Sequence, residues 1–357
     1  MDEDCLKLST YMAERRRTDD GFVSDVLLGL FERHRIACGV AMRGISGFGT
    51  MRRFRTDESL TLSEDPPVAI VAVDTRTKIE PLLEPVLSIK QRGLATLERA
   101  RLLRDDIAPA ELPEDLRDSV KLTIYVGRKE RVYGVPAYIA ICDLLYRRRI
   151  AGASVLLGVD GVSHGRRQRA HFLSRNVDVP MMILAVGSGE HIGRVLPELG
   201  GLLHRPMFTL ERVQVCKRDG QLVERPHALP GMDEHGLPLW QKLTIYTSEA
   251  AHHDGAPIHR GIVQRLRRAR TADGATVLRG VWGFHGERPP HGDGLLSLTR
   301  RVPVVTIVID TPANIAESFG VIDELTCDEG LVTSEMVPAL VSDEGGTGPP
   351  RMARHRY

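Results

Sequence analysis

Apolar and polar positions follow the same order three times along this chain. In the first copy, Lys7–Met12 alternates as a half-buried strand does, and the apolar residues of 22–31 then recur at helical spacing. Two strands, a second helix and a last strand are expected after these, at 36–45, 67–74, 79–87 and 94–103. The first copy therefore predicts the order strand, helix, strand, strand, helix, strand.

The other two copies begin on nearly the same five residues. The three starts are Lys7–Tyr11 (KLSTY), Lys121–Tyr125 (KLTIY) and Lys242–Tyr246 (KLTIY). A repeat of this kind indicates several copies of one small domain. The order of elements is that of an α+β, ferredoxin-like domain (βαββαβ), in which both helices cover one face of an antiparallel sheet.

A sheet covered on one face only leaves a second apolar face to be buried. Three joined copies can bury these faces around a common axis, as a homotrimer does with three chains. We therefore expect an intrachain pseudo-trimer, and the sequence leaves open whether it assembles further. The expected copies are 5–104, 120–217 and 241–340, with linkers at 105–119 and 218–240 and a disordered tail at 341–357.

Composition excludes several classes of protein. Lys and Arg number 48 against 47 for Asp and Glu, so bulk charge predicts no nucleic-acid binding. No apolar run approaches the ~18 residues of a membrane span, and the acidic start of the chain is not that of a signal peptide. The five cysteines are scattered without a C-x-x-C pair, which indicates a reduced, cytoplasmic protein.

A glycine-rich segment, Arg43–Gly49 (RGISGFG), is the first candidate for chemistry. Glycines tolerate positive φ and allow backbone N–H groups to converge on an anion, and Arg43, Arg52, Arg53 and Arg55 could neutralise a phosphate or carboxylate there. The alternative is that the glycines only shape a turn and the arginines solvate it. The sequence leaves both interpretations open.

Several segments together resemble the domain of unknown function 190 family. They are Arg43–Gly49, Leu62–Val68 (LSEDPPV) and Gly93–Glu98 (GLATLE), with Gly274–Gly280 (GATVLRG) and Val308–Thr311 (VIDT) in the third copy. That family is similar in structure to the P-II nitrogen-regulatory signalling proteins. The resemblance implies P-II-like domains in trimer-type packing and a non-enzymatic, regulatory function.

The resemblance also implies where an effector would bind. In P-II proteins the G-F-G turn opens a long mobile loop, and nucleotide lies in the cleft between neighbouring subunits. P-II proteins also have a second phosphate-holding loop, T-G-x-x-G-D-G, which has no counterpart in this chain. The second copy in addition departs from the glycine pattern at 159–165. We therefore expect the second copy to be mainly structural and leave open whether it has a working site. The residues that match are Gly44, Gly47, Phe48, Gly49, Gly280, Gly283 and Phe284. Arg43, Arg52 and Arg279 complete the candidate effector site, because their charge beside the glycine segments could neutralise an anion.

The expected function is therefore that of an effector-controlled regulatory protein. A small anionic effector, with an adenine nucleotide as first candidate, would bind in the interdomain clefts and order the loops 47–65 and 283–301. Those loops would contact a partner, either a membrane transporter or another regulatory target protein. The alternative is an effector-free structural or scaffolding module that binds another protein constitutively.

The sequence supports an enzymatic or metal-binding function less well than a regulatory one. Gly161–Gly165 (GVSHG) fits the nucleophile-elbow pattern, but arginines follow it where an elbow requires a helix. His252 and His253 are adjacent and so are expected to point apart, which leaves the third copy with scattered histidines and no expected metal site. No residue has a context for acid–base or covalent catalysis, so no catalytic residue is expected.

Overall fold

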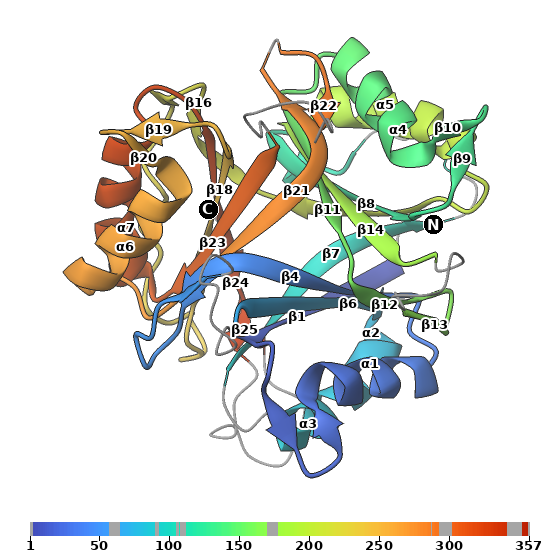
Figure 1. The fold of residues 1–357 in the computed structure, drawn as a ribbon, viewed down its shortest axis with the longest axis horizontal. Coiled ribbons are helices and arrows are strands. Elements are labelled where there is room, and N and C mark those ends of the chain that lie inside the picture. Colours follow the sequence, from blue (N-terminus) through green and yellow to red (C-terminus); the bar gives the residue numbers. More distant parts are fainter. Residues whose placement is uncertain are drawn as a thin grey trace.

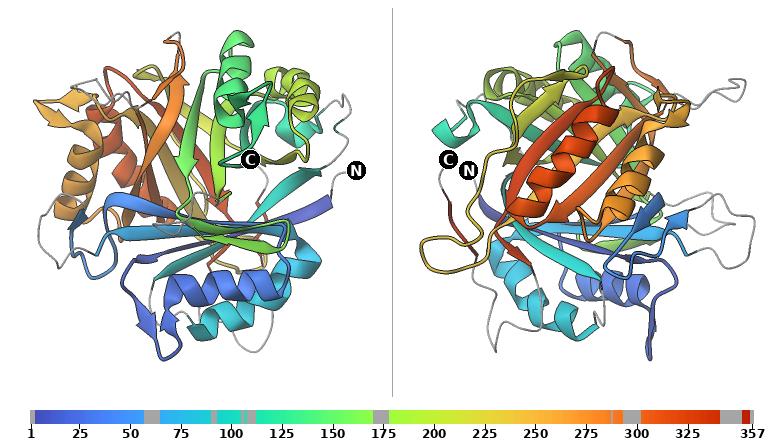
Figure 2. Two further views of the ribbon diagram at one scale, coloured as in Figure 1. Left: turned by 45° about the vertical axis from the view of Figure 1, so that its right-hand side comes forward. Right: turned by 90° about the vertical axis from the view of Figure 1, so that its left-hand side faces the viewer.

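Three lobes, each with its helices outward, surround strands that meet at the centre of the molecule (Figure 1). The computed structural model describes residues 3–56, 65–89, 93–104, 107, 112–169, 178–286, 288–292, 302–340 and 352–355. Each lobe is one of the three copies predicted from the sequence, called repeats 1, 2 and 3 below. Figure 2 shows the helices of repeat 1 on the side of its sheet that faces away from the other two lobes.

Repeat 1 has the predicted order of elements. Its strands pair antiparallel in the order β4–β6–β1–β7. The elements are β1 (Glu3–Ala13), α1 (Val23–Arg33), β4 (Cys38–Phe48), β6 (Pro67–Thr75), α2 (Arg76–Ile79) continued by a 3-10 turn (Glu80–Leu82) and α3 (Leu83–Ile89), and β7 (Leu94–Arg104).

Repeats 2 and 3 have the same order and the same pairing, β11–β14–β8–β15 and β21–β23–β18–β24. Repeat 2 consists of β8 (Ser119–Gly127), α4 (Ala137–Arg147), β11 (Gly152–Leu157), β12 (Asp160–Ser163), β14 (Pro180–Ser188), α5 (Gly189–Leu202) and β15 (Met207–Arg212). Repeat 3 consists of β18 (Trp240–Ser248), α6 (Ile258–Ala269), β21 (Ala275–His285), β23 (Pro303–Asp310), α7 (Pro312–Leu325) and β24 (Leu331–Val337). The mixed α+β class predicted from the sequence is confirmed.

Short elements complete the structure. A hairpin of two-residue strands precedes the first helix of each repeat, which the hydrophobic pattern did not indicate: β2 (Arg17–Thr18) with β3 (Gly21–Phe22), β9 (Arg131–Val132) with β10 (Val135–Pro136), and β19 (His252–His253) with β20 (Ala256–Pro257). The remaining elements are β5 (Arg55–Thr56), a 3-10 turn (Glu114–Leu116), β13 (Arg166–Arg169), β16 (Gln214–Arg218), β17 (Gln221–Leu222), β22 (His291–Gly292) and β25 (Ala339–Leu340).

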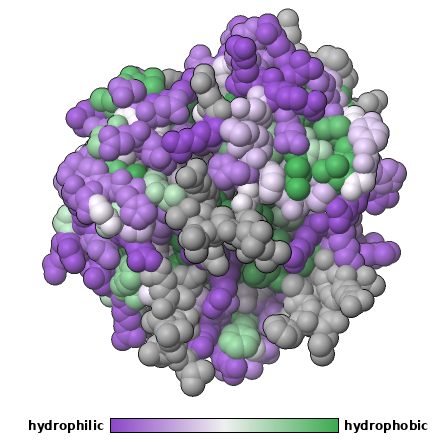
Figure 3. Space-filling model, turned by 45° about the horizontal axis from the view of Figure 1, so that its top comes forward, coloured by the Kyte–Doolittle hydropathy of each residue, from purple (hydrophilic) through white to green (hydrophobic). Residues whose placement is uncertain are grey.

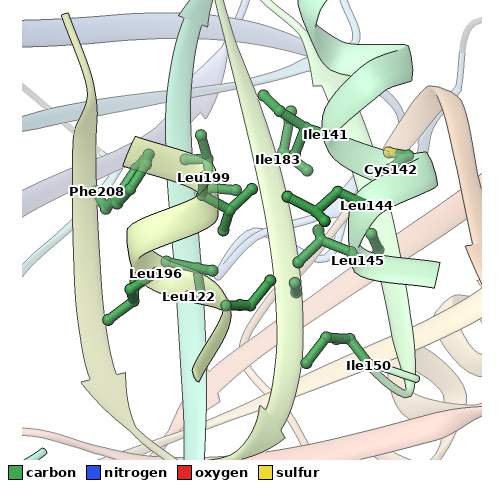
Figure 4. Close-up of a cluster of buried hydrophobic side chains, with 14 of the residues drawn as sticks. Leu122, Ile141, Cys142, Leu144, Leu145, Ile150, Ile183, Leu196, Leu199 and Phe208 are labelled. Atoms are coloured by element: carbon green, nitrogen blue, oxygen red, sulfur yellow. The ribbon is translucent and has the colours of Figure 1, made fainter. Parts of the chain in front are cut away.

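The second strand of each repeat joins it to its neighbours. β4 of repeat 1 pairs with β21 of repeat 3 and with β12 of repeat 2, and β11 of repeat 2 pairs with β21. These joins link 19 of the described strands, drawn from all three repeats, into one sheet, and the other six described strands form the three short hairpins. Three separate hydrophobic clusters lie under the helices, and a fourth, drawn from all three repeats, fills the centre. Figure 4 shows the cluster of repeat 2, where Ile141 and Leu145 of α4 and Leu196 and Leu199 of α5 pack onto the sheet.

A closed ring of buried charges lies where the three repeats meet. Each repeat supplies one lysine from its first strand and one glutamate from its last, and all six residues are at most 6% exposed. Each lysine pairs with the glutamate of its own repeat, at 3.1 Å for Lys7–Glu98 and Lys121–Glu211 and 3.2 Å for Lys242–Glu335. Each also pairs with a glutamate of another repeat: Lys7 with Glu211, Lys121 with Glu335, and Lys242 with Glu98.

The ring explains the lysine at the start of each repeat. Burial by itself would raise the pKa of Glu98, but the ammonium groups of Lys242 and Lys7 hold it well below its usual range. Removing one partner of a buried ion pair costs about 3–5 kcal/mol, because the other charge is left without compensation. We therefore expect the ring to hold the repeats in register.

Part of the C-terminal tail differs from the expectation of a disordered segment. Ala353 is fully buried, its N–H donates to the carbonyl of Pro338 at 2.9 Å, and Arg99 of β7 donates to the carbonyl of Ala353 at 2.9 Å. Residues 352–355 thus pack on repeat 1. In the part of the chain that the structure describes, no helix has the length and apolar character needed to cross a membrane.

Candidate functional site

Three clefts lie at equivalent positions between the repeats. We name them by the repeats they separate: cleft 3/1 (about 310 Å³), cleft 1/2 (about 280 Å³) and cleft 2/3 (about 1080 Å³). Each is lined by the tyrosine of one first strand, by the end of that repeat's second strand, and by the start of a neighbour's second strand. The tyrosines are Tyr11, Tyr125 and Tyr246, and the neighbours' strand starts are Ala275, Cys38 and Gly152. The surface in Figure 3 is mainly polar, with small apolar patches between the polar residues.

Cleft 3/1 combines arginines with an aromatic and apolar wall. Arg16, Arg53 and Arg55 line it, opposed by the carboxylates of Asp273 and Asp310. Trp240, Tyr11, Met12, Leu94, Ile307 and Ile309 provide the rest of the wall.

The cations and anions of cleft 3/1 differ in how far they are already satisfied. Arg55 forms an ion pair with Asp65, whereas exposed Arg53 has no ion pair or hydrogen bond among the described residues. One carboxylate oxygen of buried Asp310 accepts from the N–H of Asp273 at 2.7 Å, and the other accepts from Asn314 Nδ2 at 2.8 Å. Within the described residues the cleft therefore presents one cation without a partner, Arg53, while its buried anion, Asp310, is internally bound.

Cleft 2/3 is larger and has the opposite balance of charge. Among the described lining residues, Asp219, Asp328 and Glu329 stand with one arginine, Arg288, whose Nη1 lies 3.9 Å from a carboxylate oxygen of Glu329. Burial lowers the pKa of His285, in spite of Asp219 at 3.3 Å from its Nε2, so this ring is neutral at neutral pH. This cleft favours a cation over an anion.

Cleft 1/2 carries charges of both signs. Lys129 and Arg205 line it together with Glu130 and Asp178. Burial raises the pKa of Glu130 above its usual value. Its wall has no tryptophan or phenylalanine among the described residues. It offers neither the arginine excess nor the aromatic wall of cleft 3/1.

The predicted site residues are only partly brought together in these clefts. Phe48 and Gly49 line cleft 3/1, and Phe284 lines cleft 2/3. Of the arginines predicted for the site, Arg53 and Arg55 line cleft 3/1. Arg43, Arg52 and Arg279 do not line any of the three clefts in the described structure, and each is held by other groups. Arg43 pairs with Glu14 at 3.0 Å, Arg279 pairs with Glu249 at 2.7 Å, and Arg52 donates to the carbonyl of Arg267 at 3.3 Å and lies 3.4 Å from Asp273.

The predicted glycine turn is in fact continuous strand. Gly44 and Gly47 lie within β4, and Gly280 and Gly283 within β21. A Cβ atom on Gly47 would lie 2.5 Å from the carbonyl oxygen of Ala275 in repeat 3. These glycines therefore allow strands of two repeats to cross closely, and do not form an anion cradle.

Repeat 2 also has glycines that allow close strand crossing, at the position where its sequence was expected to depart from the glycine pattern. Added Cβ atoms would lie 2.3 Å from the carbonyl oxygen of Pro180 at Gly158 and 2.4 Å from that of Gly39, in repeat 1, at Gly161. The G-x-x-G spacing is thus kept in all three repeats, at Gly44 and Gly47, Gly158 and Gly161, and Gly280 and Gly283. The close crossing of strands at Gly161 explains the glycine that begins the G-x-S-x-G match. The expected loops 47–65 and 283–301 lie partly outside the described residues, at 57–64, 287 and 293–301.

Sequence reasoning missed several lining residues of cleft 3/1. Arg53 and Arg55 were named from the sequence as arginines that could neutralise an anion, and both line the cleft, whereas Arg16 and Trp240 were not singled out. Trp240 begins the first strand of repeat 3 yet faces a cleft formed with repeat 1. Only the packing of the repeats brings these residues together, so no local motif could have identified them.

The three repeats share one fold and have equivalent clefts between them, so the chain consists of three tandem copies of one α+β domain. A family model described as "Uncharacterized ACR", DUF190, matches residues 5–102, 119–215 and 240–339. The chain belongs to the DUF190 family and contains three tandem copies of its domain.

Proposed function

We propose that this protein is a non-enzymatic, P-II-like regulatory protein that binds a small anionic effector in cleft 3/1. Its repeats act as three ferredoxin-like domains packed as an intrachain pseudo-trimer. The observation that carries the proposal is the meeting of Arg16, Arg53 and Arg55 with Trp240 in one cleft between repeats.

Charge supports an anion in this cleft. Arginine presents donors in a planar fork that matches phosphate and carboxylate oxygens. Arg53 is exposed and has no partner among the described residues, so within the described structure no ion pair has to be broken for it to bind a ligand. The other two clefts have an acidic or a mixed lining, so the proposal assigns the effector to cleft 3/1.

The apolar part of the cleft supports a ligand with a flat ring. A volume of about 310 Å³ is at the lower end of the range of small-molecule sites. The indole of Trp240 offers a stacking surface, and stacking of a base on an aromatic side chain contributes about 1–3 kcal/mol. An adenine nucleotide combines a flat base with an anionic phosphate and is the first effector to test.

We propose that effector binding changes the part of the cleft wall formed by the residues directly after β4. Gly49, Thr50 and Met51 line the cleft directly before Arg53 and Arg55. An effector held by these arginines would fix this segment and change what it presents to a target protein, such as a membrane transporter. In this account the protein acts in the cytoplasm.

Calorimetric titration with ATP, ADP, AMP, cyclic AMP and cyclic di-AMP tests the proposal. We expect saturable binding of at least one nucleotide at one site per chain. Arg53→Ala should weaken that binding about tenfold, the equivalent of one charge-assisted hydrogen bond. Arg288→Ala, an exposed arginine of cleft 2/3, is the matched control and should leave the affinity unchanged. Equal affinity in the two variants would refute the assignment to cleft 3/1, and the absence of binding across the panel would favour the effector-free scaffold.

A further inference from the structure

Three potential metal ligands from distant parts of repeat 3 meet at the edge of cleft 2/3. They are His253 of β19, and Cys327 and Asp328 in the loop between α7 and β24. One ligand atom from each lies within 4.8 Å of the other two. His253 Nδ1 and Cys327 Sγ are 3.8 Å apart.

These separations suit one shared ion. In tetrahedral zinc sites the metal lies about 2.3 Å from a thiolate sulfur and about 2.0 Å from an imidazole nitrogen, which places the two ligand atoms roughly 3.6 Å apart. The observed 3.8 Å needs only a small adjustment. The exposed side chains of Cys327 and Asp328 leave room for that adjustment and for a water molecule as fourth ligand.

The second nitrogen of His253 lies near a carboxylate, as is common for metal-binding histidines. His253 Nε2 lies 3.5 Å from a carboxylate oxygen of Asp254, while Nδ1 faces Cys327. Metal-bound histidines usually donate their other N–H to a carboxylate, which fixes the tautomer and the orientation of the ring. This arrangement does not follow from the proximity of the three ligands and supports the site independently.

The surrounding charge also favours a cation. Asp219 and Glu329 line the same cleft as Asp328, with Arg288 the only arginine among the described lining residues. A divalent ion would therefore enter an acidic region. Imidazole, thiolate and carboxylate together are ligands typical of zinc.

We propose that His253, Cys327 and Asp328 bind a divalent transition-metal ion of the zinc class, with an open fourth position. The ion links the β19–β20 hairpin to the loop that precedes β24. Because Asp328 also lines cleft 2/3, the ion fixes one wall of that cleft. This site is separate from the effector site in cleft 3/1, so either proposal can fail alone.

Cobalt binding to the metal-free full chain tests the site directly. A bound thiolate gives Co²⁺ a sulfur-to-metal charge-transfer absorption, and Cys327 is the only exposed cysteine of the five, the others being buried. We expect this absorption to saturate at one Co²⁺ per chain and to be displaced by Zn²⁺. Cys327→Ser should abolish it, and Asp254→Asn should weaken Co²⁺ binding about tenfold.

His252→Gln is the matched control. His252 is exposed, directly precedes His253, and its Nδ1 lies 2.7 Å from the carbonyl oxygen of Ala250. We expect His252→Gln to bind Co²⁺ as the unmodified chain does, while His253→Gln loses most of the affinity. Zn²⁺ should also slow the reaction of Cys327 with a thiol reagent. No saturable cobalt binding, an unchanged absorption in Cys327→Ser, or equal loss in both histidine variants would overturn the proposal.

Discussion

The centre of the molecule and the clefts at its edge use the same three repeats in opposite ways. At the centre every repeat contributes the same two side chains, a lysine and a glutamate, to one closed ring. In the clefts the backbone segments are equivalent, but the side chains differ: cleft 3/1 has an excess of arginine and cleft 2/3 an excess of acid. Packing therefore constrains the residues at the centre, whereas the side chains that line the clefts differ from one cleft to the next.

The physical reason is the difference in solvent. Each charge of the ring is buried and has two partners, so a change in one repeat leaves charges of two repeats uncompensated. A charged side chain at an open cleft remains hydrated, and its replacement usually changes stability by no more than about 0.5 kcal/mol.

Breaking the ring should have the largest effect. We expect Glu98→Ala to lower the free energy of unfolding by about 3–5 kcal/mol, because Lys7 and Lys242 each lose a buried partner. Chemical denaturation measures the change. Glu190→Ala, which removes an exposed partner of Arg194, is the control and should cost less than about 1 kcal/mol. Equal effects of the two changes would show that the ring does not hold the centre.

Acid should weaken the centre for the same reason. Burial opposes ionisation, but Lys121 and Lys242 hold the pKa of Glu335 below the ordinary value of 4.5, as the lysines do for Glu98. The unfolded chain therefore binds more protons than the folded chain below about pH 4.5, and the free energy of unfolding should fall as the pH falls through this range. Denaturant midpoints across this range check the slope, which Glu98→Gln should reduce. A stability that stays constant into acid would contradict the assignment of charged glutamates.

Removing the aromatic wall of cleft 3/1 should affect binding and leave the centre intact. We expect Trp240→Ala to weaken nucleotide binding about tenfold, at the lower end of the range for base stacking. Calorimetric titration measures the affinity. Chemical denaturation of the same variant should not show the loss of about 3–5 kcal/mol in the free energy of unfolding that is expected for a broken ring. Full affinity without the indole would mean that the base does not stack there.

The smallest effects are expected from clefts 1/2 and 2/3. Lys129→Ala in cleft 1/2 and Arg288→Ala in cleft 2/3 both remove a cation from a cleft wall. We expect less than about a twofold change in effector affinity from either, because neither residue lines cleft 3/1. A tenfold loss in either variant would place the effector in that cleft instead.

The repeat and its order of elements could be predicted from the sequence because hydrophobic periodicity is local and occurs three times. The hairpins before the first helices could not, since two-residue strands such as His252–His253 have no period of their own. The conspicuous Lys7, Lys121 and Lys242 marked the repeats, but their role depends on glutamates that lie far along the chain and partly in other repeats. The sequence could not place these charges at one centre.

The candidate sites show the same limit. The glycines of Arg43–Gly49 were evident, but the reason for them is a neighbouring strand more than 200 residues away, at Ala275. His253 was set aside because it adjoins His252, and nothing local linked it to Cys327. Chemistry assembled across repeats and loops becomes visible only when the fold is known.

Fluorescence of Trp240 during nucleotide titration tests the central claim most directly. The chain has two tryptophans, so Trp282→Phe leaves Trp240 as the only one. Our account predicts that a bound nucleotide quenches this fluorescence in a saturable manner, and that Arg53→Ala in the same background shifts the midpoint to about tenfold higher concentration. Nucleotide binding seen by calorimetry with no change at Trp240 would contradict the placement of the effector in cleft 3/1.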